Sequence, residues 1–205
     1  MIAIIDYGVG NLYSLSHSLS FLGIDNTVTR DPSVIAAADK LILPGVGAFG
    51  DARRKLGEGG MDQLLIDRAK RGTPLLGICL GMQLLFERSY EYGVHPGLSL
   101  IPGEICPLKS DIPASLKVPH IGWNALQFLR PCPLLRYIRE GDSVYYVHSF
   151  YAKGAGYAVK AASEYGTEVP GLVQAGNVYG AQFHPEKSGP VGLQILRAFG
   201  EVAAC

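Results

Sequence analysis

The sequence predicts an α/β fold with a mostly parallel central sheet flanked by helices and an antiparallel β extension in the C-terminal half. In the first half, short apolar runs typical of buried strands alternate with segments of helical periodicity. Such alternation is typical of a parallel sheet covered by helices on both faces. The second half is rich in strand-forming residues, and Ala175-Gly176-Asn177 has the composition of a hairpin turn.

The expected elements of the first half follow from local patterns. We expect strands over 1–7, 26–30, 40–44 and 73–79. Leucines recur at helical spacing in 11–23, where Gly23 suits the end of the helix. Asp31-Pro32 opens a short helix, with Asp as N-cap and Pro at the first position. Further helices are expected over 61–71 and 80–88.

In the second half the expected strands lie within 142–153, 157–164 and 171–183. A helix over about 190–203 closes the chain. The sequence contains no repeats, no low-complexity stretch and no clear linker. A chain of 205 residues with 48% hydrophobic residues is long enough to bury one sizeable core, so we expect a single domain over 1–205.

The charge balance and the N-terminus exclude several classes of protein. Eighteen basic and eighteen acidic residues give a net charge of zero, so no basic surface for nucleic acid or anionic lipid is predicted. The apolar run at the N-terminus is too short for a secretory signal, and no segment approaches a membrane span. We therefore expect a cytoplasmic protein.

The cysteine pattern is also consistent with the reducing cytoplasm. They lack CxxC spacing, and a chain of this size without a secretory signal favours free thiols over disulfides. The four cysteines are Cys79, Cys106, Cys132 and Cys205.

The sharpest chemical signal lies around Cys79, where the apolar run Leu75 to Ile78 meets the start of an expected helix. A nucleophile on a tight strand-to-helix turn needs minimal side chains two positions away on each side, and Gly77 and Gly81 meet that need. The thiol would then lie at the positive end of a helix dipole, which favours thiolate. A buried core cysteine between two packing glycines is the other interpretation.

A cysteine nucleophile needs a base, and the base needs an orienting group. His184-Pro185-Glu186 supplies both residue types, and it follows the apolar run 178–183. The end of a strand is where open α/β sheets place their sites. A strand-terminating turn with surface polar residues remains the alternative. His148 lies in an aromatic strand without a carboxylate nearby in sequence, and His17, His95 and His120 are weaker candidates.

The third signal is the glycine-rich loop that starts at Pro44, after an expected strand. Gly45, Gly47 and Gly50 match the GxGxxG pattern of dinucleotide-binding loops. The match is weak, because Asp-Ala-Arg-Arg follows the glycines rather than a clear apolar helix. The alternative is a loop whose peptide can rotate to aim an N–H at an oxyanion.

Together these three segments resemble the signature of the class I glutamine amidotransferases. That family carries a PGxG loop, a GxCxGxQ elbow and a C-terminal HPE, which stand here at 44–47, 77–83 and 184–186. The order and spacing match, and the resemblance covers almost the whole chain. It implies the fold of that family and a glutaminase activity without a metal or an organic cofactor.

Further segments resemble the branch of this family that serves histidine biosynthesis. They are 6–12, 45–49, 81–86, 119–124, 146–151 and 183–188. The resemblance implies a partner, a cyclase subunit with a (β/α)8 barrel, which forms a heterodimer with this chain and takes up its ammonia. Rival interpretations are a glutaminase for anthranilate or aminodeoxychorismate synthesis, a nucleotide-binding regulatory module and an inactive scaffold. The context of Trp123 and Lys187 favours the histidine branch.

The resemblance also implies residue roles. Cys79 would attack glutamine and form a thioester, His184 would move the proton, and Glu186 would orient His184. The N–H groups of Val46 and Leu80 would form the oxyanion hole. Positions expected to hold glutamine are Gly45, Gly47, Gln83, Glu91, Ser149 and Phe150. Residues expected at the partner interface are Asn11, Trp123, Tyr145 and Lys187. A helix N-cap for Asn11 and a core position for Trp123 are the alternatives.

Overall fold

The computed structural model describes residues 1–203 and is built on an eight-stranded mixed sheet in the order β2-β1-β3-β4-β14-β13-β12-β9. Parallel pairing joins the first five of these strands, which are β2 (Asn26–Thr29), β1 (Ile2–Ile5), β3 (Lys40–Leu43), β4 (Leu75–Ile78) and β14 (Val178–Ala181). Antiparallel pairing then adds β13 (Glu168–Ala175), β12 (Val159–Glu164) and β9 (Gln127–Phe128). The predicted parallel sheet with an antiparallel extension is confirmed.

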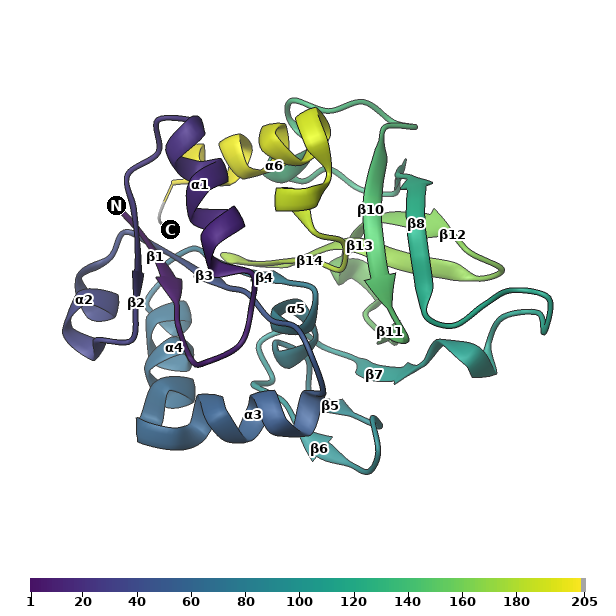
Figure 1. The fold of residues 1–205 in the computed structure, drawn as a ribbon, viewed down its shortest axis with the longest axis horizontal. Coiled ribbons are helices and arrows are strands. Elements are labelled where there is room, and N and C mark those ends of the chain that lie inside the picture. Colours follow the sequence, from purple (N-terminus) through teal and green to yellow (C-terminus); the bar gives the residue numbers. More distant parts are fainter. Residues whose placement is uncertain (204–205) are drawn as a thin grey trace.

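Helices cover both faces of the sheet, as Figure 1 shows. On one face lie α1 (Leu12–Phe21) and α6 (Gly189–Glu201); on the other lie α2 (Pro32–Ala37), α3 (Phe49–Gly57), α4 (Met61–Lys70) and α5 (Leu80–Leu84). Strand β1 contributes side chains to the hydrophobic cores on both faces of the sheet, because successive side chains of a strand point to opposite faces. Ile2 and Ile4 pack with the α1 and α6 side, whereas Ala3 and Ile5 pack with the α3 and α4 side.

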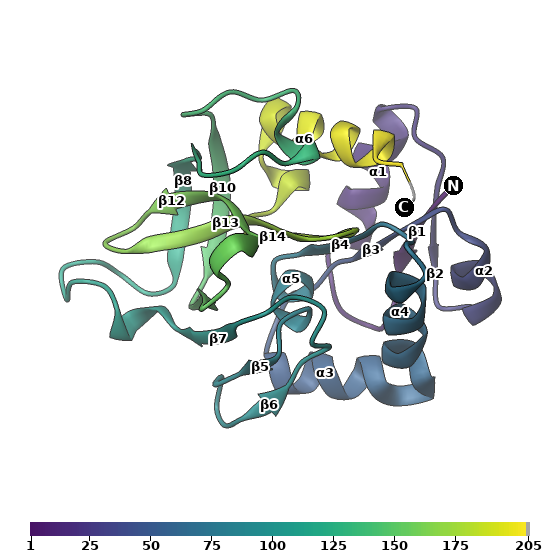
Figure 2. The same cartoon turned by 180° about the vertical axis from the view of Figure 1, so that it is seen from behind.

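Two smaller sheets lie beside the central one (Figure 2). Strand β8 (His120–Ala125) pairs antiparallel with β10 (Ser143–His148). The other sheet has the order β11-β7-β5-β6, with β11 (Phe150–Lys153), β7 (Glu104–Pro107), β5 (Arg88–Ser89) and β6 (His95–Pro96). Short 3₁₀ turns span Glu58–Gly60, Leu108–Ser110, Pro133–Leu135, Gly156–Ala158 and Pro185–Lys187. In both views β8 and β10 stand at the opposite end of the molecule from α2.

Most predicted elements are present, with two corrections. The helix expected over 80–88 ends at Leu84, because the carbonyl groups of Leu84 and Leu85 accept hydrogen bonds from the N–H groups of Leu98 and Leu100 instead of continuing the helix. Helix α3 was not expected after the glycine-rich loop. Its buried face, Phe49, Ala52 and Leu56, has helical spacing that the intervening charged residues obscured.

The predicted Asp31 cap and the predicted hairpin turn at Gly176 are confirmed. Asp31 caps α2, since its Oδ1 accepts from the Ser33 N–H across 2.8 Å. The turn at Gly176 and Asn177 joins β13 to β14 as a hairpin. Within residues 1–203, no helix is both long and apolar enough to cross a membrane. The described cysteines, Cys79, Cys106 and Cys132, are free thiols, and Cys205 lies outside the described residues.

Candidate active site

Cys79 occupies the sharp turn between β4 and α5. Its backbone angles, φ 53° and ψ −112°, lie in a region that non-glycine residues rarely adopt. A Cβ atom on Gly81 would lie 1.8 Å from the carbonyl oxygen of Leu43, and one on Gly77 would lie 2.7 Å from the carbonyl group of Gly81. Both neighbours are backbone atoms that cannot move aside. The two glycines are therefore required by the turn that presents Cys79.

His184 lies beside this turn because β14 is the parallel neighbour of β4, with Ala181 in register with Ile78. Its imidazole Nδ1 is 2.9 Å from Oε1 of Glu186, and both side chains are almost fully buried. A buried carboxylate orients a histidine and stabilises its charged form. The predicted base and its orienting group are thus paired through Nδ1, which leaves Nε2 as the nitrogen available for chemistry.

The electrostatics of His184 favour its protonated form. Burial by itself disfavours the charged imidazole, but the interactions with Cys79 and with Glu186 outweigh it and raise the pKa of His184 to about 9. Neither Nε2 of His184 nor Oε2 of Glu186 has a hydrogen-bond partner among the described residues. An unpaired buried nitrogen beside a thiol is the arrangement expected of a base that awaits substrate, since such contacts are often long without one.

Cys79 and His184 open into a cavity of about 420 Å³. Of the residues expected to act on or hold glutamine, the cavity wall includes Val46, Gly47, Leu80, Gln83, Glu91, Ser149 and Phe150. Gly45 is not on the wall; a Cβ on it would lie 2.7 Å from the Gly81 nitrogen, so it packs against the elbow instead. Glu186 is also not part of the wall.

Glu91 has a specific structural contact in addition to its place in the wall. Its Oε2 accepts a hydrogen bond from the N–H of Phe49, the first residue of α3, across 2.6 Å. Burial raises the pKa of this carboxyl, and the Phe49 contact partly opposes that rise. The carboxylate thus occupies the helix N-terminus where a dinucleotide-binding loop would place its phosphates. This contact argues against the nucleotide-binding interpretation.

The residues expected at the partner interface lie in different settings. Trp123 is 56% exposed on β8, so the interpretation as a core residue is wrong. Its ring contacts that of Tyr145 on β10, with 5.8 Å between centroids. Asn11 holds the N-cap position of α1, but its side chain makes no capping hydrogen bond. Lys187 lines the cavity near Cys79 rather than lying apart from it.

Two residues near Cys79 were missed by sequence reasoning. Gln182 is fully buried, and its Nε2 donates toward Sγ of Cys79 across 3.9 Å. The hydroxyl of Tyr7 donates to the Pro44 carbonyl across 2.8 Å, and burial, with a contribution from Cys79, raises the pKa of this phenol. A glutamine inside an otherwise apolar strand was an available signal for Gln182. Tyr7 carried no such signal, since tyrosine is common at the end of a strand.

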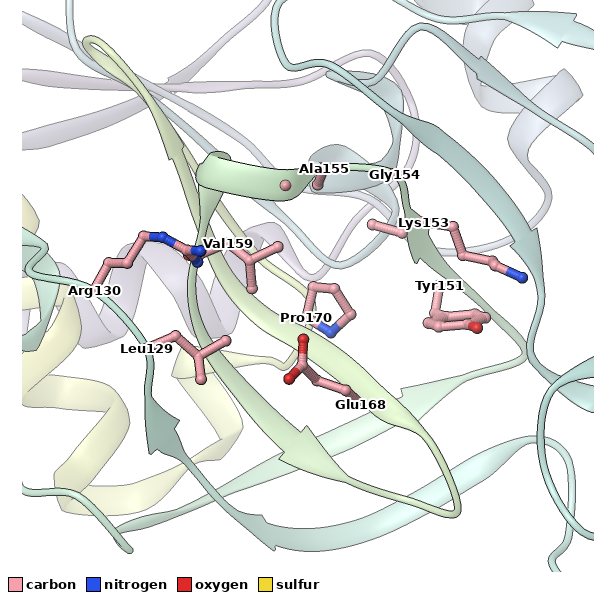
Figure 3. Close-up of a pocket in the computed structure, with 11 residues that line it drawn as sticks. Leu129, Arg130, Tyr151, Lys153, Gly154, Ala155, Val159, Glu168 and Pro170 are labelled. Atoms are coloured by element: carbon pink, nitrogen blue, oxygen red, sulfur yellow. The ribbon is translucent and has the colours of Figure 1, made fainter.

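A second cavity, of about 570 Å³, lies on the antiparallel side of the molecule (Figure 3). None of the predicted site residues lines it. Arg130 and Lys153 lie on opposite sides of it. Both cations have partners: Arg130 donates to the Val159 carbonyl, and Lys153 pairs with Asp111. Within residues 1–203 no group of three or more His, Cys, Asp and Glu side chains is arranged to hold a metal ion.

Comparison with known proteins supports the same conclusion as the geometry. The family model described as glutamine amidotransferase class-I matches residues 3–202. The chain belongs to the class I glutamine amidotransferase family. Its activity is accordingly that of a glutamine amidotransferase, with Cys79, His184 and Glu186 as the candidate triad.

Individual relatives of this amidotransferase are similar over nearly their whole length. The imidazole glycerol phosphate synthase subunit HisH of Listeria monocytogenes serotype 4a is 49% identical over 202 residues, which is 98% of this chain and 96% of the relative. The subunit of that name from Bacillus cereus strain G9842 is 52% identical over 199 residues, 97% of this chain and 93% of the relative. A crystal structure of a glutamine amidotransferase shares the fold, with TM-score 0.75, 20% identity and coverage of 98% and 100%.

Proposed function

We propose that this amidotransferase is the glutaminase subunit of an imidazole glycerol phosphate synthase, hydrolysing glutamine to glutamate and ammonia for histidine biosynthesis. One observation carries the proposal: Cys79 on its strained turn shares a single cavity with the buried His184, which Glu186 orients. The identity of about half the residues to HisH subunits, over nearly the full length, supports this branch of the family over the anthranilate and aminodeoxychorismate branches.

In the first half-reaction the sulfur of Cys79 attacks the carboxamide carbon of glutamine. The thiol proton is held on Nε2 of His184 as the imidazolium, and the tetrahedral intermediate collapses when that proton is delivered to the leaving nitrogen. Ammonia departs and a γ-glutamyl thioester remains. In the second half-reaction His184 takes a proton from water, the hydroxide attacks the thioester, and glutamate leaves as Cys79 recovers its proton. Glu186 stabilises the imidazolium formed in each half-reaction.

The negative charge of each tetrahedral intermediate falls on the former carboxamide oxygen. The N–H of Leu80, the first residue of α5, has no partner within the helix and is available to that oxygen. Val46 supplies the second N–H from the glycine-rich loop across the cavity. Gly47, Gln83, Glu91, Ser149 and Phe150 hold the substrate, and Gly45 contributes by fixing the loop against the elbow.

Ammonia released here passes to a cyclase subunit with a (β/α)8 barrel, which forms a heterodimer with this chain. The exposed Trp123 with its neighbour Tyr145 supports an interface on the β8 and β10 sheet, and Asn11 and Lys187 complete it. The chain acts as one domain, in the cytoplasm, without a cofactor.

Release of glutamate from glutamine tests the proposal. We expect measurable turnover when the chain is mixed with a histidine-pathway cyclase subunit and its nucleotide ligand, and weak turnover alone. The partner subunit of an anthranilate synthase serves as the control and is expected to have no effect. Absence of glutamate release in every mixture, from a folded chain with a reactive Cys79, would contradict the proposal.

A further inference from the structure

The carbonyl oxygen of Phe150 is held from two sides at the wall of the glutamine cavity. Nε2 of Gln83 donates to it across 3.0 Å, and Nδ1 of His148 lies 2.9 Å from it. A carbonyl oxygen has two lone pairs, and these two contacts use both. Gln83 belongs to α5, which begins at Leu80, whereas His148 ends β10. The Phe150 carbonyl therefore locks the elbow helix to the β8 and β10 sheet.

The contacts continue from Gln83 to the sulfur of Cys79. Gln83 Nε2 also donates to Oε1 of Gln182 across 3.1 Å, and Nε2 of Gln182 donates toward Cys79 Sγ across 3.9 Å. Because Gln83 donates to the Gln182 oxygen, the amide of Gln182 is oriented with its nitrogen toward the sulfur. A donor aimed at a sulfur stabilises negative charge on it.

The contacts also continue outward from His148. Its Nδ1 faces a carbonyl and must donate, so Nε2 of the neutral ring accepts. Nε2 lies 3.0 Å from Nδ1 of His120, which is therefore the donor. Burial, aided by the nearby His120 and His184, lowers the pKa of His148 to about 3. The ring thus stays neutral at physiological pH, with Nδ1 as the donor to the Phe150 carbonyl and Nε2 as an acceptor.

His120 is itself firmly placed. Its ring stacks between those of Tyr146 and Tyr165, with centroids 4.9 and 3.8 Å away, and it is fully buried. Its Nε2 lies 2.7 Å from Oδ1 of Asn124, and Nδ2 of Asn124 donates to the Glu164 carbonyl in β12. His120 and Asn124 lie on the inner side of β8, while Ile121 and Trp123 alternate with them on the exposed side.

We propose that His120 and His148 are positioning residues for the glutaminase reaction. They hold the Phe150 carbonyl, and through Gln83 they hold the Gln182 amide against the Cys79 sulfur. The line of contacts runs without a break from Asn124 on β8 to the nucleophile. The effect on turnover rests on the proposed glutaminase function, but the effect on the sulfur does not.

Loss of the His148 or the His120 imidazole should displace the residues that contact Cys79. Removing the His148 imidazole leaves the Phe150 carbonyl with one partner, and removing the His120 imidazole leaves His148 Nε2 without its contact. Either change lets Gln83 turn toward the Phe150 carbonyl or away from Gln182. Displacements of about 1 Å in residues that place a reacting group can cost ~10²-fold in rate. The substrate contacts of Gly47, Glu91 and Ser149 remain, so the loss falls on turnover more than on glutamine binding.

Two pairs of variants separate this role from a structural one. His148→Leu removes both nitrogens, whereas His148→Gln can still donate to the Phe150 carbonyl. His120→Phe keeps the ring between Tyr146 and Tyr165 but loses its donor. Tyr165→Phe is the matched control in the same stack, since its hydroxyl donates to the Lys117 carbonyl and not to a residue of this line of contacts. Asn124→Ala, at the partly exposed end of the line, is a milder variant in case the buried changes prevent folding.

The first measurement is glutamine hydrolysis in the complex with the cyclase subunit. We expect His148→Leu and His120→Phe to lower kcat by ~10- to 100-fold with a smaller change in KM. His148→Gln should recover most of the loss, Asn124→Ala should lose less than His120→Phe, and Tyr165→Phe should stay within about twofold of the unmodified chain. Unchanged kcat in His148→Leu and His120→Phe would overturn the inference.

The second measurement is the rate at which iodoacetamide alkylates Cys79 in the lone chain, read by mass spectrometry. It needs neither glutamine nor a partner, so it separates this inference from the proposed function. Slower alkylation in His148→Leu and His120→Phe, with the rate restored in His148→Gln, supports the line of contacts. Equal rates in all these folded variants overturn it, whether or not the chain proves to be a glutaminase.

Discussion

The backbone N–H of Cys79 donates to the carbonyl oxygen of Ala181 across 2.7 Å. This contact extends the pairing of β4 and β14 by one step past the last residue of β4. The chain leaving β14 reaches His184 three residues later, so the nucleophile and its base are joined through two adjacent strand ends. Rigid elements of this kind hold reacting groups more precisely than loops do.

Replacing the nucleophile should abolish glutamine hydrolysis. Cys79→Ala and Cys79→Ser should lack glutamate release, whereas synthesis from added ammonium salts by the complex with the cyclase should persist. Cys132→Ala is the control, because Cys132 is also buried but lies outside the cavity. A glutamine-like electrophile should label Cys79 and spare Cys106, Cys132 and Cys205. Labelling of another cysteine, together with full activity in Cys79→Ala, would contradict the assignment.

Replacing the base should lower turnover more than replacing the group that orients it. General acid–base catalysis is commonly worth ~10²–10⁴-fold, so His184→Ala should lose turnover by that order. Glu186→Gln should lose less, since Glu186 only orients and stabilises the imidazole. Turnover at saturating glutamine measures both. A larger loss in Glu186→Gln than in His184→Ala would mean that the roles are wrongly assigned.

The raised pKa of His184 has consequences for pH dependence. Burial lowers this pKa, but Cys79 and Glu186 together raise it to about 9, above the ordinary value of 6.5. The stabilisation from the protonated ring is therefore fully present below pH 6.5 and is lost as the pH rises through about 9. Glutaminase activity that needs the imidazolium should decline over the same alkaline range. Glu186→Gln removes one cause of the raised pKa, so the alkaline decline in the activity of this variant should move to lower pH. An unchanged pH profile would count against the ion pair of His184 and Glu186.

Gly81→Ala should destabilise the fold as well as the site. The added Cβ would lie 1.8 Å from the Leu43 carbonyl oxygen, and overpacking of this kind typically costs ~1–3 kcal/mol. At roughly 2–4 °C per kcal/mol for a chain of this size, the melting temperature should fall by several degrees. Gly57→Ala is the control, because a Cβ there would meet only the far ends of the Arg53 and Asp62 side chains. Equal melting temperatures for the two variants would refute the steric argument.

The lone chain should be a poor glutaminase that its partner activates. Gly47 has φ 100°, and a Cβ on it would meet nothing within 4 Å, so the peptides around Val46 are free to adopt more than one orientation. One oxyanion donor is typically worth about 10²–10³ in turnover, so a partner that favours the productive orientation raises kcat. Binding of glutamine should change much less. Steady-state kinetics of the lone chain, the complex and the complex with cyclase ligand test this prediction. Equal turnover in all three states would exclude activation by the partner.

Local sequence patterns predicted the class of fold and several of its turns and caps. The requirement for glycine on both sides of Cys79 follows from the steric limits of a strand-to-helix turn, and the Asp31 cap and the hairpin at Gly176 follow from similar local rules. The alternation of apolar strands and helices was sufficient for the class of fold. Residue types at the elbow and at His184 predicted the chemistry only together with the resemblance to the glutamine amidotransferase family, since each segment alone also fitted a structural role.

Local patterns were less reliable where distant segments intervene. The helix that begins at Leu80 stops early because residues 97–101 return to its carbonyl groups, which no pattern inside the helix indicates. Glu91 meets the start of α3 from a loop forty-two residues away in sequence. These contacts depend on how the sheets pack, and packing is a property of the whole chain.

The sequence by itself therefore determined the class of fold, the elbow and the candidate triad. Only the tertiary structure decided which side chains surround them. It aimed the Gln182 amide at Cys79, and it stacked His120 between Tyr146 and Tyr165 within reach of His148. The physical reason is that steric and hydrogen-bonding rules act between near neighbours in the chain, whereas contacts across a hundred residues form only when the buried faces of every element pack together.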